Sequence, residues 1–390
     1  MRSFTALLLS SAIAASPAAA ADKVKIGFVS TLSGPLSALG VDIQAGFDLA
    51  AKEADNKVGG LPVEITVGDD QASADVGKQL ADKFLKRDKV DFMTGVVYTN
   101  VMLAVAPAVI SAKTFYVSTA TGPASLAGEQ CNPYFFALAW QNDGQSEAIG
   151  QYLSDKGIKS AFLVAPNYAA GKENLEGFKR YFKGTVASEV YVKLGELDYS
   201  SEMAQIRATK PDAVFLFLPG GMGVNFIKQY VAAGLDKVTP FYAPGYSADE
   251  DTIAAVGEPM VGLVNASHWA WDLDNPANKA FVAAFRKTYN RTPSMYAFQG
   301  YDAYRLIDRA VSDVNGKIED KAALHDALKA ARFDSVRGSF KFNNNQFPIQ
   351  NYYLRVVQKD DAGQITNKMI GTIFTDHTDA YAPACKMNQS

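Results

Sequence analysis

The sequence contains few of the residues that most often carry out enzymatic or metal chemistry. Among its 390 residues there are two cysteines and three histidines. The histidines, His268, His325 and His377, lack the spacing of metal ligands. No Gly-x-Ser-x-Gly element of a hydrolase is present, and neither cysteine has the sequence context of a nucleophile. We therefore expect no metal site, no cofactor and no enzymatic activity.

An excess of charge of one sign is also missing. The chain has 38 Lys and Arg residues against 41 Asp and Glu, a formal net charge of −3. This charge is too small, and of the wrong sign, for a nucleic-acid-binding surface. Beyond the N-terminal leader, no segment approaches the roughly 18 apolar residues that a membrane-spanning helix requires. With 48% hydrophobic residues the chain can fill more than one core, so two lobes are expected.

The first 21 residues have the pattern of a secretory signal. Arg2 supplies a positive charge, residues 6–15 are almost entirely apolar, and residues 16–21 are small or proline. Cleavage is expected after Ala20 or Ala21. No cysteine lies near this point, which disfavours a lipid anchor, so the sequence predicts a soluble periplasmic protein.

The predicted periplasmic location bears on the state of the two cysteines, Cys131 and Cys385. Export places them in an oxidising environment, where a pair of cysteines commonly forms a disulfide. We predict that they do so and tie the C-terminal tail, residues 381–390, to the first lobe. Two separate thiols are the alternative.

Apolar runs of strand length alternate with amphipathic segments of helix length along most of the chain. Strands are predicted over residues 24–30, 63–68, 90–94, 114–118, 161–165, 186–192, 213–218, 238–243, 261–266, 351–358 and 368–374. Helices are predicted over residues 41–56, 74–86, 101–111, 172–182, 201–209, 224–233, 279–289 and 297–314. Repeated βα units favour parallel sheets covered by helices on both faces. The fold class is therefore α/β, and the alternation starts again near residue 161.

Two loops, residues 95–100 and 117–123, are rich in hydroxyl side chains. Each follows a predicted strand and precedes a helix, which places hydroxyl and backbone N–H groups at helix N-termini. Because such positions attract anions, we interpret the loops as two sides of one carboxylate site.

The sequence also resembles a family, the type I periplasmic binding proteins of ABC importers, in the branch of leucine/isoleucine/valine-binding proteins. The resemblance covers essentially all of the mature chain, and its motifs are specific in their order and spacing. They are Ile26-Gly27-Phe28, Ser33-Gly34-Pro35, Gly40, Gly46, Asp69-Asp70, Gly95, Ala106-Pro107, residues 118–123, Asn167-Tyr168, Gly171, Gly234-Leu235 and Tyr301-Asp302-Ala303.

This resemblance implies two Rossmann-like lobes with parallel-rich sheets, joined by three crossing strands. Lobe 1 would comprise residues 22–141 and 271–349, and lobe 2 residues 142–270 and 350–380. The crossings are placed near residues 140–142, 269–272 and 348–351. A ligand would bind in the cleft, the lobes would close around it, and a membrane permease would recognise the closed, monomeric protein.

The resemblance also implies site residues. Those matching the two carboxylate loops are Tyr98, Thr99, Thr119, Ala120 and Thr121. Those matching other cleft positions are Leu39, Tyr168, Gly220 and Tyr296, and Trp140 matches less well. The alternatives are that Thr99 and Thr121 only cap helices, and that the tyrosines belong to the core.

One departure from the family concerns the ligand's ammonium group. Amino-acid binders of this family place an acidic residue where this chain has Gly245, and Gly220 stands where an aromatic residue can occur. Since a buried ammonium needs an acidic partner, the sequence favours an aromatic or hydrophobic acid over a zwitterionic amino acid. Asp249, Glu250 and Asp251 could replace the missing acid, or they could form a solvated or capping turn. A branched-chain amino acid binder and a soluble ligand-sensing module are the alternative functions.

Overall fold

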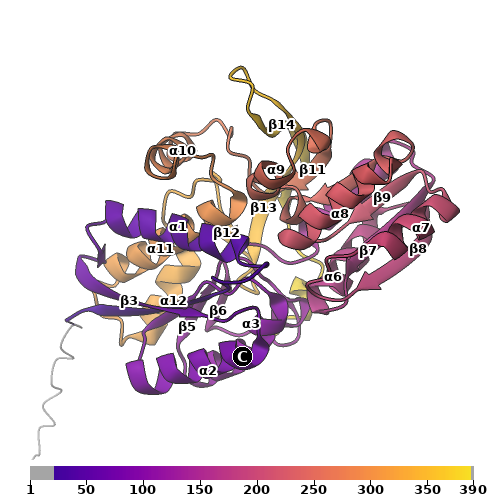
Figure 1. Cartoon of the computed structure of the whole chain (residues 1–390). Helices are drawn as coiled ribbons and strands as arrows, with labels where there is room; N and C mark the ends of the chain where they lie inside the picture. Colours follow the sequence, from indigo (N-terminus) through magenta and orange to yellow (C-terminus); the bar gives the residue numbers. More distant parts are fainter. Residues whose placement is uncertain (1–21, 388–390) are drawn as a thin grey trace, which may run out of the picture.

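The computed structural model describes residues 22–387, so the predicted signal peptide, residues 1–21, lies outside the described residues. Within them the chain forms two β-sheets, each flanked by helices (Figure 1). We call the half around the first sheet lobe 1 and the half around the second sheet lobe 2. No helix among the described residues is both long and apolar enough to span a bilayer.

The sheet of lobe 1 has the strand order β2-β3-β1-β4-β5-β6 and is parallel except for the β2–β3 pair. Its strands are β1 (Val24–Ser30), β2 (Lys57–Val58), β3 (Leu61–Asp69), β4 (Phe92–Thr94), β5 (Phe115–Ser118) and β6 (Phe135–Ala137). Its helices are α1 (Ala38–Glu53), α2 (Ala74–Lys83), α3 (Thr99–Ser111), α4 (Ala124–Ala127), α10 (Pro276–Tyr289), α11 (Met295–Asp313) and α12 (Lys321–Ala330). Helices α1 and α11 pack on each other on one side of the sheet, and α2 and α3 pack together on the other (Figure 1).

The sheet of lobe 2 has the order β12-β13-β11-β10-β9-β7-β8, with β14 paired to β13. Its parallel strands are β7 (Ser160–Pro166), β8 (Thr185–Val192), β9 (Ala213–Leu216), β10 (Phe241–Pro244) and β11 (Val264–Ser267). The antiparallel strands are β12 (Lys341–Phe342), β13 (Pro348–Lys359) and β14 (Ile365–His377). Its helices are α5 (Gly144–Asp155), α6 (Ala169–Tyr181), α7 (Ser200–Thr209), α8 (Gly221–Ala232) and α9 (Glu250–Val256).

Local sequence explains where several helices begin. Ser73, Ser294 and Asp320 each accept a hydrogen bond from a backbone N–H of the first turn of α2, α11 and α12. Asn275 does the same for α10, whose first residue is Pro276, the position where proline's missing N–H costs nothing. These caps fix the ends of helices whose apolar faces are buried against the sheets.

The chain passes between the lobes three times. Residues 138–143 join β6 to α5, and residues 268–275 join β11 to α10. The third crossing is β13, which pairs first with β12 and then with β11. Although β12 extends the second sheet, its Phe342 packs against Phe136 of β6 in lobe 1. The predicted fold class, two Rossmann-like lobes joined by three crossings, is confirmed. The buried Arg337 links two of the crossings, because its guanidinium donates to Leu138 O (2.9 Å) and to Gln350 Oε1 (2.8 Å).

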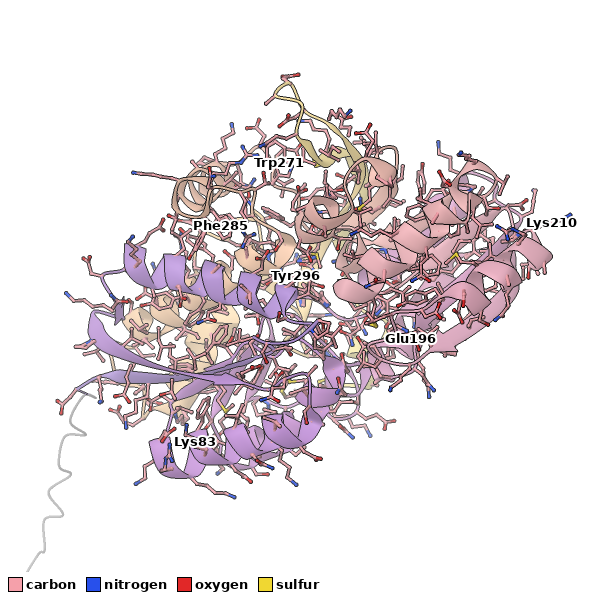
Figure 2. All side chains as sticks on the ribbon, viewed as in Figure 1. Lys83, Glu196, Lys210, Trp271, Phe285 and Tyr296 are labelled. Atoms are coloured by element: carbon pink, nitrogen blue, oxygen red, sulfur yellow. A yellow bond between two sulfur atoms is a disulfide. The ribbon has the colours of Figure 1, made fainter. Side chains whose placement is uncertain are left out.

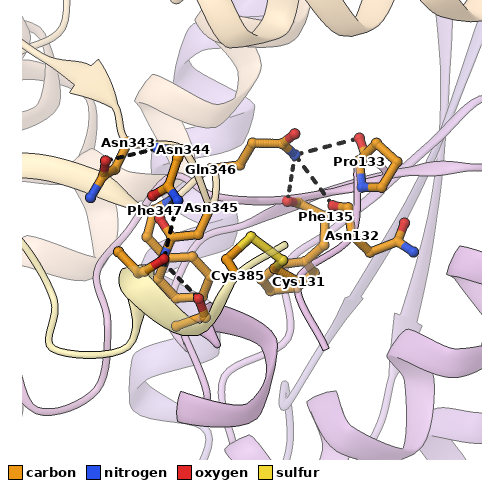
Figure 3. Close-up of a disulfide and its surroundings, with 12 residues drawn as sticks. Cys131, Asn132, Pro133, Phe135, Asn343, Asn344, Asn345, Gln346, Phe347 and Cys385 are labelled. Carbon is orange, nitrogen blue, oxygen red and sulfur yellow. Dashed lines mark hydrogen bonds between the residues drawn. A yellow bond between two sulfur atoms is a disulfide. The ribbon is translucent and has the colours of Figure 1, made fainter. Parts of the chain in front are cut away.

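The predicted disulfide between Cys131 and Cys385 is present (Figure 3). It fastens the segment after β14 to the loop before β6, across 254 residues of sequence. Asn345 supports the same junction, since its Nδ2 donates to Ala127 O (2.8 Å) and to Asp379 Oδ2 (3.0 Å). The tail is therefore held against lobe 1 by covalent and polar contacts.

Some predicted boundaries differ from the structure. The helix predicted over 41–56 is α1, which begins three residues earlier, at Ala38. The strand predicted over 238–243 begins only at Phe241, because Val238 follows a 3-10 turn and is 74% exposed. Helix α5 was not predicted, since it buries the polar residues Gln145, Ser146 and Glu147, which removes the amphipathic pattern.

Candidate ligand-binding site

A small cavity lies between the two lobes. Figure 2 shows Tyr296, one of its lining residues, where the lobes meet. The lining residues are Leu39, Val97, Tyr98, Thr99, Ala120, Trp140, Asn142, Tyr168, Ala170, Asn174, Phe217, Pro219, Tyr246 and Tyr296. They come from lobe 1, from lobe 2 and from the first crossing, so both lobes are needed to form the cavity. No Asp, Glu, Lys or Arg occurs in this set of described residues.

One end of the cavity is formed by the N-terminus of α3. Thr99 is the first residue of this helix, and the residue before it, Tyr98, provides no side-chain cap. The Val101 N–H donates to Tyr98 O at 3.0 Å, whereas no such bond is formed by the N–H groups of Thr99 and Asn100. These two groups therefore keep their capacity to bind an anion, and the helix dipole favours negative charge there. The first of the two hydroxyl-rich loops thus contributes both a helix terminus and a hydroxyl to the cavity wall.

The two predicted carboxylate loops meet through their threonines. Thr99 Oγ1 and Thr121 Oγ1 are 2.6 Å apart, and both side chains are buried. Asn142 Nδ2 donates to Thr99 Oγ1 at 3.2 Å. Neither hydroxyl caps a helix, since the N-cap residues that precede α3 and α4 are Tyr98 and Pro123 and neither helix has a side-chain cap.

The hydrogen-bonding capacity of Thr99 is suited to a carboxylate ligand. Either threonine can donate the hydrogen bond that joins Thr99 to Thr121. When Thr121 donates, Thr99 Oγ1 accepts from both Thr121 and Asn142, and the Thr99 proton is left for a group in the cavity. The arrangement supplies a neutral donor without a counter-charge.

Aromatic rings form the rest of the wall. The Trp140 ring centroid lies 5.0 Å from that of Tyr246 and 5.8 Å from that of Tyr296. The Phe217 centroid lies 5.7 Å from Tyr246 and 6.5 Å from Tyr168, whose ring is nearly parallel to it. A planar apolar ligand can contact several of these rings at once.

The structure places six of the predicted site residues in the lining: Leu39, Tyr98, Thr99, Ala120, Tyr168 and Tyr296. The Tyr98 hydroxyl donates to Leu36 O at 2.9 Å, so the protein already satisfies this donor. Gly220 borders the same region, because a Cβ built on it would lie 3.7 Å from the Tyr98 hydroxyl oxygen and 3.8 Å from Leu39.

Three predicted residues are placed differently. Thr119 and Thr121 are buried but are not among the lining residues. Gly245 is also outside the lining, and a Cβ built on it would meet Gln145 Oε1 at 2.8 Å and Arg355 Nη2 at 2.9 Å. A side chain at position 245 would therefore point into the packed hinge region, because the backbone of the short 3-10 turn (Gly245–Ser247) sets its direction.

The first two residues of the acidic run after this turn, Asp249 and Glu250, are buried, so they do not form a solvated turn. Asp249 stands at the N-cap position of α9, although its side chain makes no capping hydrogen bond. Asp249 is fully buried and accepts hydrogen bonds from Arg355 Nη1 (2.8 Å) and from the backbone N–H of Met295. Burial raises the pKa of Asp249, and the Arg355 guanidinium opposes this. Burial also raises the pKa of Glu250, to about 7, and the negative charge of Asp249 is the second-largest cause of this increase. Asp249 thus ties lobe 2 to the N-terminus of α11, instead of entering the cavity.

Sequence reasoning missed several lining residues. Asn142 lies on a predicted crossing and Phe217 in a predicted strand, but neither was assigned to the site. Tyr246 also lines the cavity. It directly follows the predicted site residue Gly245, and an aromatic side chain at that position could have indicated a ligand contact. No group of His, Cys, Asp and Glu residues in the described part of the chain is arranged to hold a metal ion.

Two α/β lobes with a cavity between them, completed by both lobes and by the crossings, define a hinged solute-binding protein. The chain belongs to the periplasmic binding protein family, whose characteristic sequence it matches over residues 23–363. This family functions in the periplasm.

Named relatives agree with this assignment. The Leu/Ile/Val-binding protein homolog 6 of Brucella melitensis biotype 1 is 32% identical over 368 residues, which cover 92% of this chain and 93% of the relative. The solute-binding protein of an R. palustris ABC transporter, solved in complex with benzoate, is 31% identical with a TM-score of 0.88, covering 93% of this chain and 99% of its own. The solute-binding protein of an ABC transporter from Rhodopseudomonas palustris BisB5, solved in complex with 3,4-dihydroxybenzoic acid, is 30% identical with a TM-score of 0.85. The match covers 92% of this chain and 99% of that protein's chain.

Proposed function

We propose that this chain captures an aromatic carboxylate in the cavity between its lobes and delivers it to the permease of an ABC importer. The observation that carries the proposal is the composition of the lining. Aromatic rings surround a cavity that has hydroxyl and helix N-terminal donors, and no charged side chain is among its described lining residues. A ligand carboxylate finds neutral donors there, whereas a buried ammonium would lack an acidic partner.

The solved relatives support an aromatic ligand, because the two R. palustris proteins hold benzoate and 3,4-dihydroxybenzoic acid. A branched-chain amino acid is the second candidate, and one observation favours it. The Oδ1 atom of Asp251 is buried without a partner, and the Asp251 charge contributes to raising the pKa of both Tyr98 and Tyr296, after the larger effect of burial. A movement of Asp251 toward the cavity would provide a partner for an ammonium group.

The proposal includes the following finer points. The lobes, residues 22–141 with 271–349 and residues 142–270 with 350–380, close on the ligand as a monomer. The mature chain starts after Ala20 or Ala21, binds no nucleic acid and releases its ligand chemically unchanged. The proposed ligand-contacting residues are Leu39, Tyr98, Thr99, Ala120, Tyr168, Gly220 and Tyr296, with Thr119 and Thr121 supporting them.

Matched pairs of ligands test the proposal. Affinity is measured by calorimetry, and melting temperature by thermal shift, for 3-phenylpropionate against L-phenylalanine and for 4-methylpentanoate against L-leucine. Each pair differs only in the α-ammonium group. We expect tight binding of 3-phenylpropionate or benzoate and a raised melting temperature, since ligand at 100 times its Kd stabilises the folded state by about 2.7 kcal/mol. Binding of L-leucine in preference to every aromatic acid would establish the second candidate instead.

Thr99→Val tests the carboxylate end of the site. Loss of a hydrogen bond to a charged group costs about 1.5–3 kcal/mol, so the affinity for the acid should fall at least about tenfold. Thr209→Val is the matched control, because Thr209 is exposed at the end of α7. Equal affinities in the two variants would place the carboxylate elsewhere. Recovery of the ligand unchanged after incubation, by mass spectrometry, checks the absence of turnover.

A further inference from the structure

The hydroxyl of Tyr246 is a buried polar group with no partner. Tyr246 lies in the 3-10 turn after β10, lines the cavity and is 3% exposed. Among the described tyrosines, only its hydroxyl oxygen is both fully buried and without a hydrogen bond. Because an unsatisfied buried hydroxyl costs free energy, this one calls for a partner that binds in the cavity.

The protein satisfies comparable hydroxyls elsewhere. Tyr98, in the same cavity, donates to Leu36 O at 2.9 Å. Tyr230 donates to Thr239 O at 2.8 Å, and Tyr304 donates to Lys57 O at 2.8 Å. These phenols pair with backbone carbonyls of the protein. At the ligand site the hydroxyls of Tyr168 and Tyr296 also make no hydrogen bond within the described chain, but only the hydroxyl of Tyr246 is fully buried as well.

The ring of Tyr246 is held in place, so its hydroxyl has a fixed position. Trp140 packs against it with a centroid distance of 5.0 Å, and Phe217 meets it edge-on at 5.7 Å. The neighbouring Gly245 is wedged against Gln145 and Arg355, which restrains the backbone of the turn. Such a group can recognise a ligand without reorganisation.

The charges behind Tyr246 oppose an anion at this end. After the dominant effect of burial, the phenols of Tyr352 and Tyr296 and the carboxyl groups of Asp143 and Glu147 raise its pKa, so the phenol is neutral. Arg180 pairs with both of these carboxyl groups and balances part of their charge. The N-terminus of α3, with Thr99, offers the more favourable position for a ligand carboxylate. A neutral polar group of the ligand is thus the natural partner of Tyr246.

We propose that Tyr246 is a specificity-determining residue that hydrogen-bonds a phenolic hydroxyl on the aromatic acid, at the end remote from its carboxylate. The inference rests on the proposed function and narrows the ligand class to hydroxylated aromatic acids. The phenolic oxygen and the Tyr246 hydroxyl can each donate or accept, so one hydrogen bond satisfies both.

The test compares Kd values for benzoate, 3-hydroxybenzoate and 4-hydroxybenzoate in the full mature protein and in Tyr246→Phe. The original protein should bind at least one hydroxybenzoate about tenfold more tightly than benzoate, the ratio that one hydrogen bond supports. Tyr246→Phe should reduce this ratio to about one while benzoate affinity stays unchanged. Tyr230→Phe is the control, because it removes a buried hydroxyl that the protein satisfies and that lies outside the cavity lining, so it should leave the ratio unaltered.

Ligand-free melting temperature provides a second measurement. Tyr246→Phe removes an unpaired oxygen and should not lower the melting temperature, whereas Tyr230→Phe, which removes a hydroxyl bonded to Thr239 O, should lower it. The inference is overturned if the ratio of affinities is the same with and without the Tyr246 hydroxyl, or if every hydroxybenzoate binds more weakly than benzoate. If no aromatic acid binds the original protein at all, the proposed function itself fails, and this assignment fails with it.

Discussion

Glu173 connects the lobes, and its replacement by glutamine should change how stability depends on pH. Glu173 belongs to α6 of lobe 2, but its carboxylate accepts hydrogen bonds from the backbone N–H of Ala124 (3.1 Å), at the start of α4 in lobe 1, and from Asn142 Nδ2 (2.6 Å). Asn142 in turn donates to Thr99 in the ligand cavity. Glu173→Gln keeps the shape of the side chain and resembles its protonated form.

The size of the effect follows from the pKa of Glu173. Burial, followed by the charge of Asp143, raises this pKa from its ordinary 4.5 to about 7. A difference of about 2.5 units corresponds to about 3 kcal/mol. Because the folded-state pKa is the higher one, the stabilising contribution is fully present below pH 4.5 and is lost as the pH rises through 7.

Urea denaturation of both proteins between pH 4 and 8 measures this contribution. Near pH 4 the free energies of unfolding should agree, and above pH 7 Glu173→Gln should be more stable by up to about 3 kcal/mol. Glu250, whose pKa burial also raises, to about 7, titrates in both proteins and cancels in the difference. Asp143, whose pKa burial raises to about 6, interacts with Glu173, so its altered titration forms part of the measured difference. A difference that stays constant across the pH range would refute the reasoning, since it would mean that Glu173 ionises at its ordinary pKa.

Further predictions concern the disulfide, the carboxylate loop and the hinge. Replacing Cys131 and Cys385 by serine should lower the free energy of unfolding by about 5 kcal/mol, the chain-entropy value for a loop closed across 254 residues. Denaturation without reductant measures this loss. A loss below about 1 kcal/mol would mean that hydrogen bonds, and not the disulfide, hold the tail in place. Thr121→Ala should weaken binding of the acid several-fold, as measured by calorimetry, because Thr99 loses the partner that orients its proton. The melting temperature should change little. Unchanged affinity would mean that Thr121 does not support the ligand-contacting residues. Gly245→Ala should lower the free energy of unfolding, measured by urea denaturation, by about 1–3 kcal/mol, because the new Cβ would displace Gln145 or Arg355. A free energy of unfolding equal to that of the original protein would contradict the packing described for this turn.

Much of the fold could be predicted because its signals are local. The alternation of apolar strands with amphipathic helices identified the α/β class, and the two cysteines in an exported chain identified the disulfide. The hydroxyl-rich loops also lie where strand ends meet helix starts, as β4 leads into α3 and β5 into α4. Helix α5 escaped prediction because its polar residues are buried against partners distant in sequence, such as Asn174 for Ser146 and Arg180 for Glu147, which only the tertiary structure reveals.

The site was harder to predict because the direction of a side chain depends on the fold around it. Gly245 matched a ligand-contacting position, but the backbone of its turn directs that position at Arg355, and the next residue, Tyr246, lines the cavity. Asp249 could be read as a solvated acid, but Arg355 and Met295, distant in sequence, enclose it. Both partners come from other elements, so no local pattern indicated them.

The bond between Cys131 and Cys385 sets the order of events during export. When export proceeds from the N-terminus, Cys131 enters the periplasm while the chain that leads to Cys385, 254 positions further on, is still being translocated. During that interval it is an unpaired thiol in an oxidising compartment, open to mixed disulfides with oxidoreductases or with neighbouring chains. Cys385 reaches the periplasm only after the strands of both sheets, because it follows β14 in the chain. The disulfide can therefore form only when nearly the whole chain has crossed the membrane.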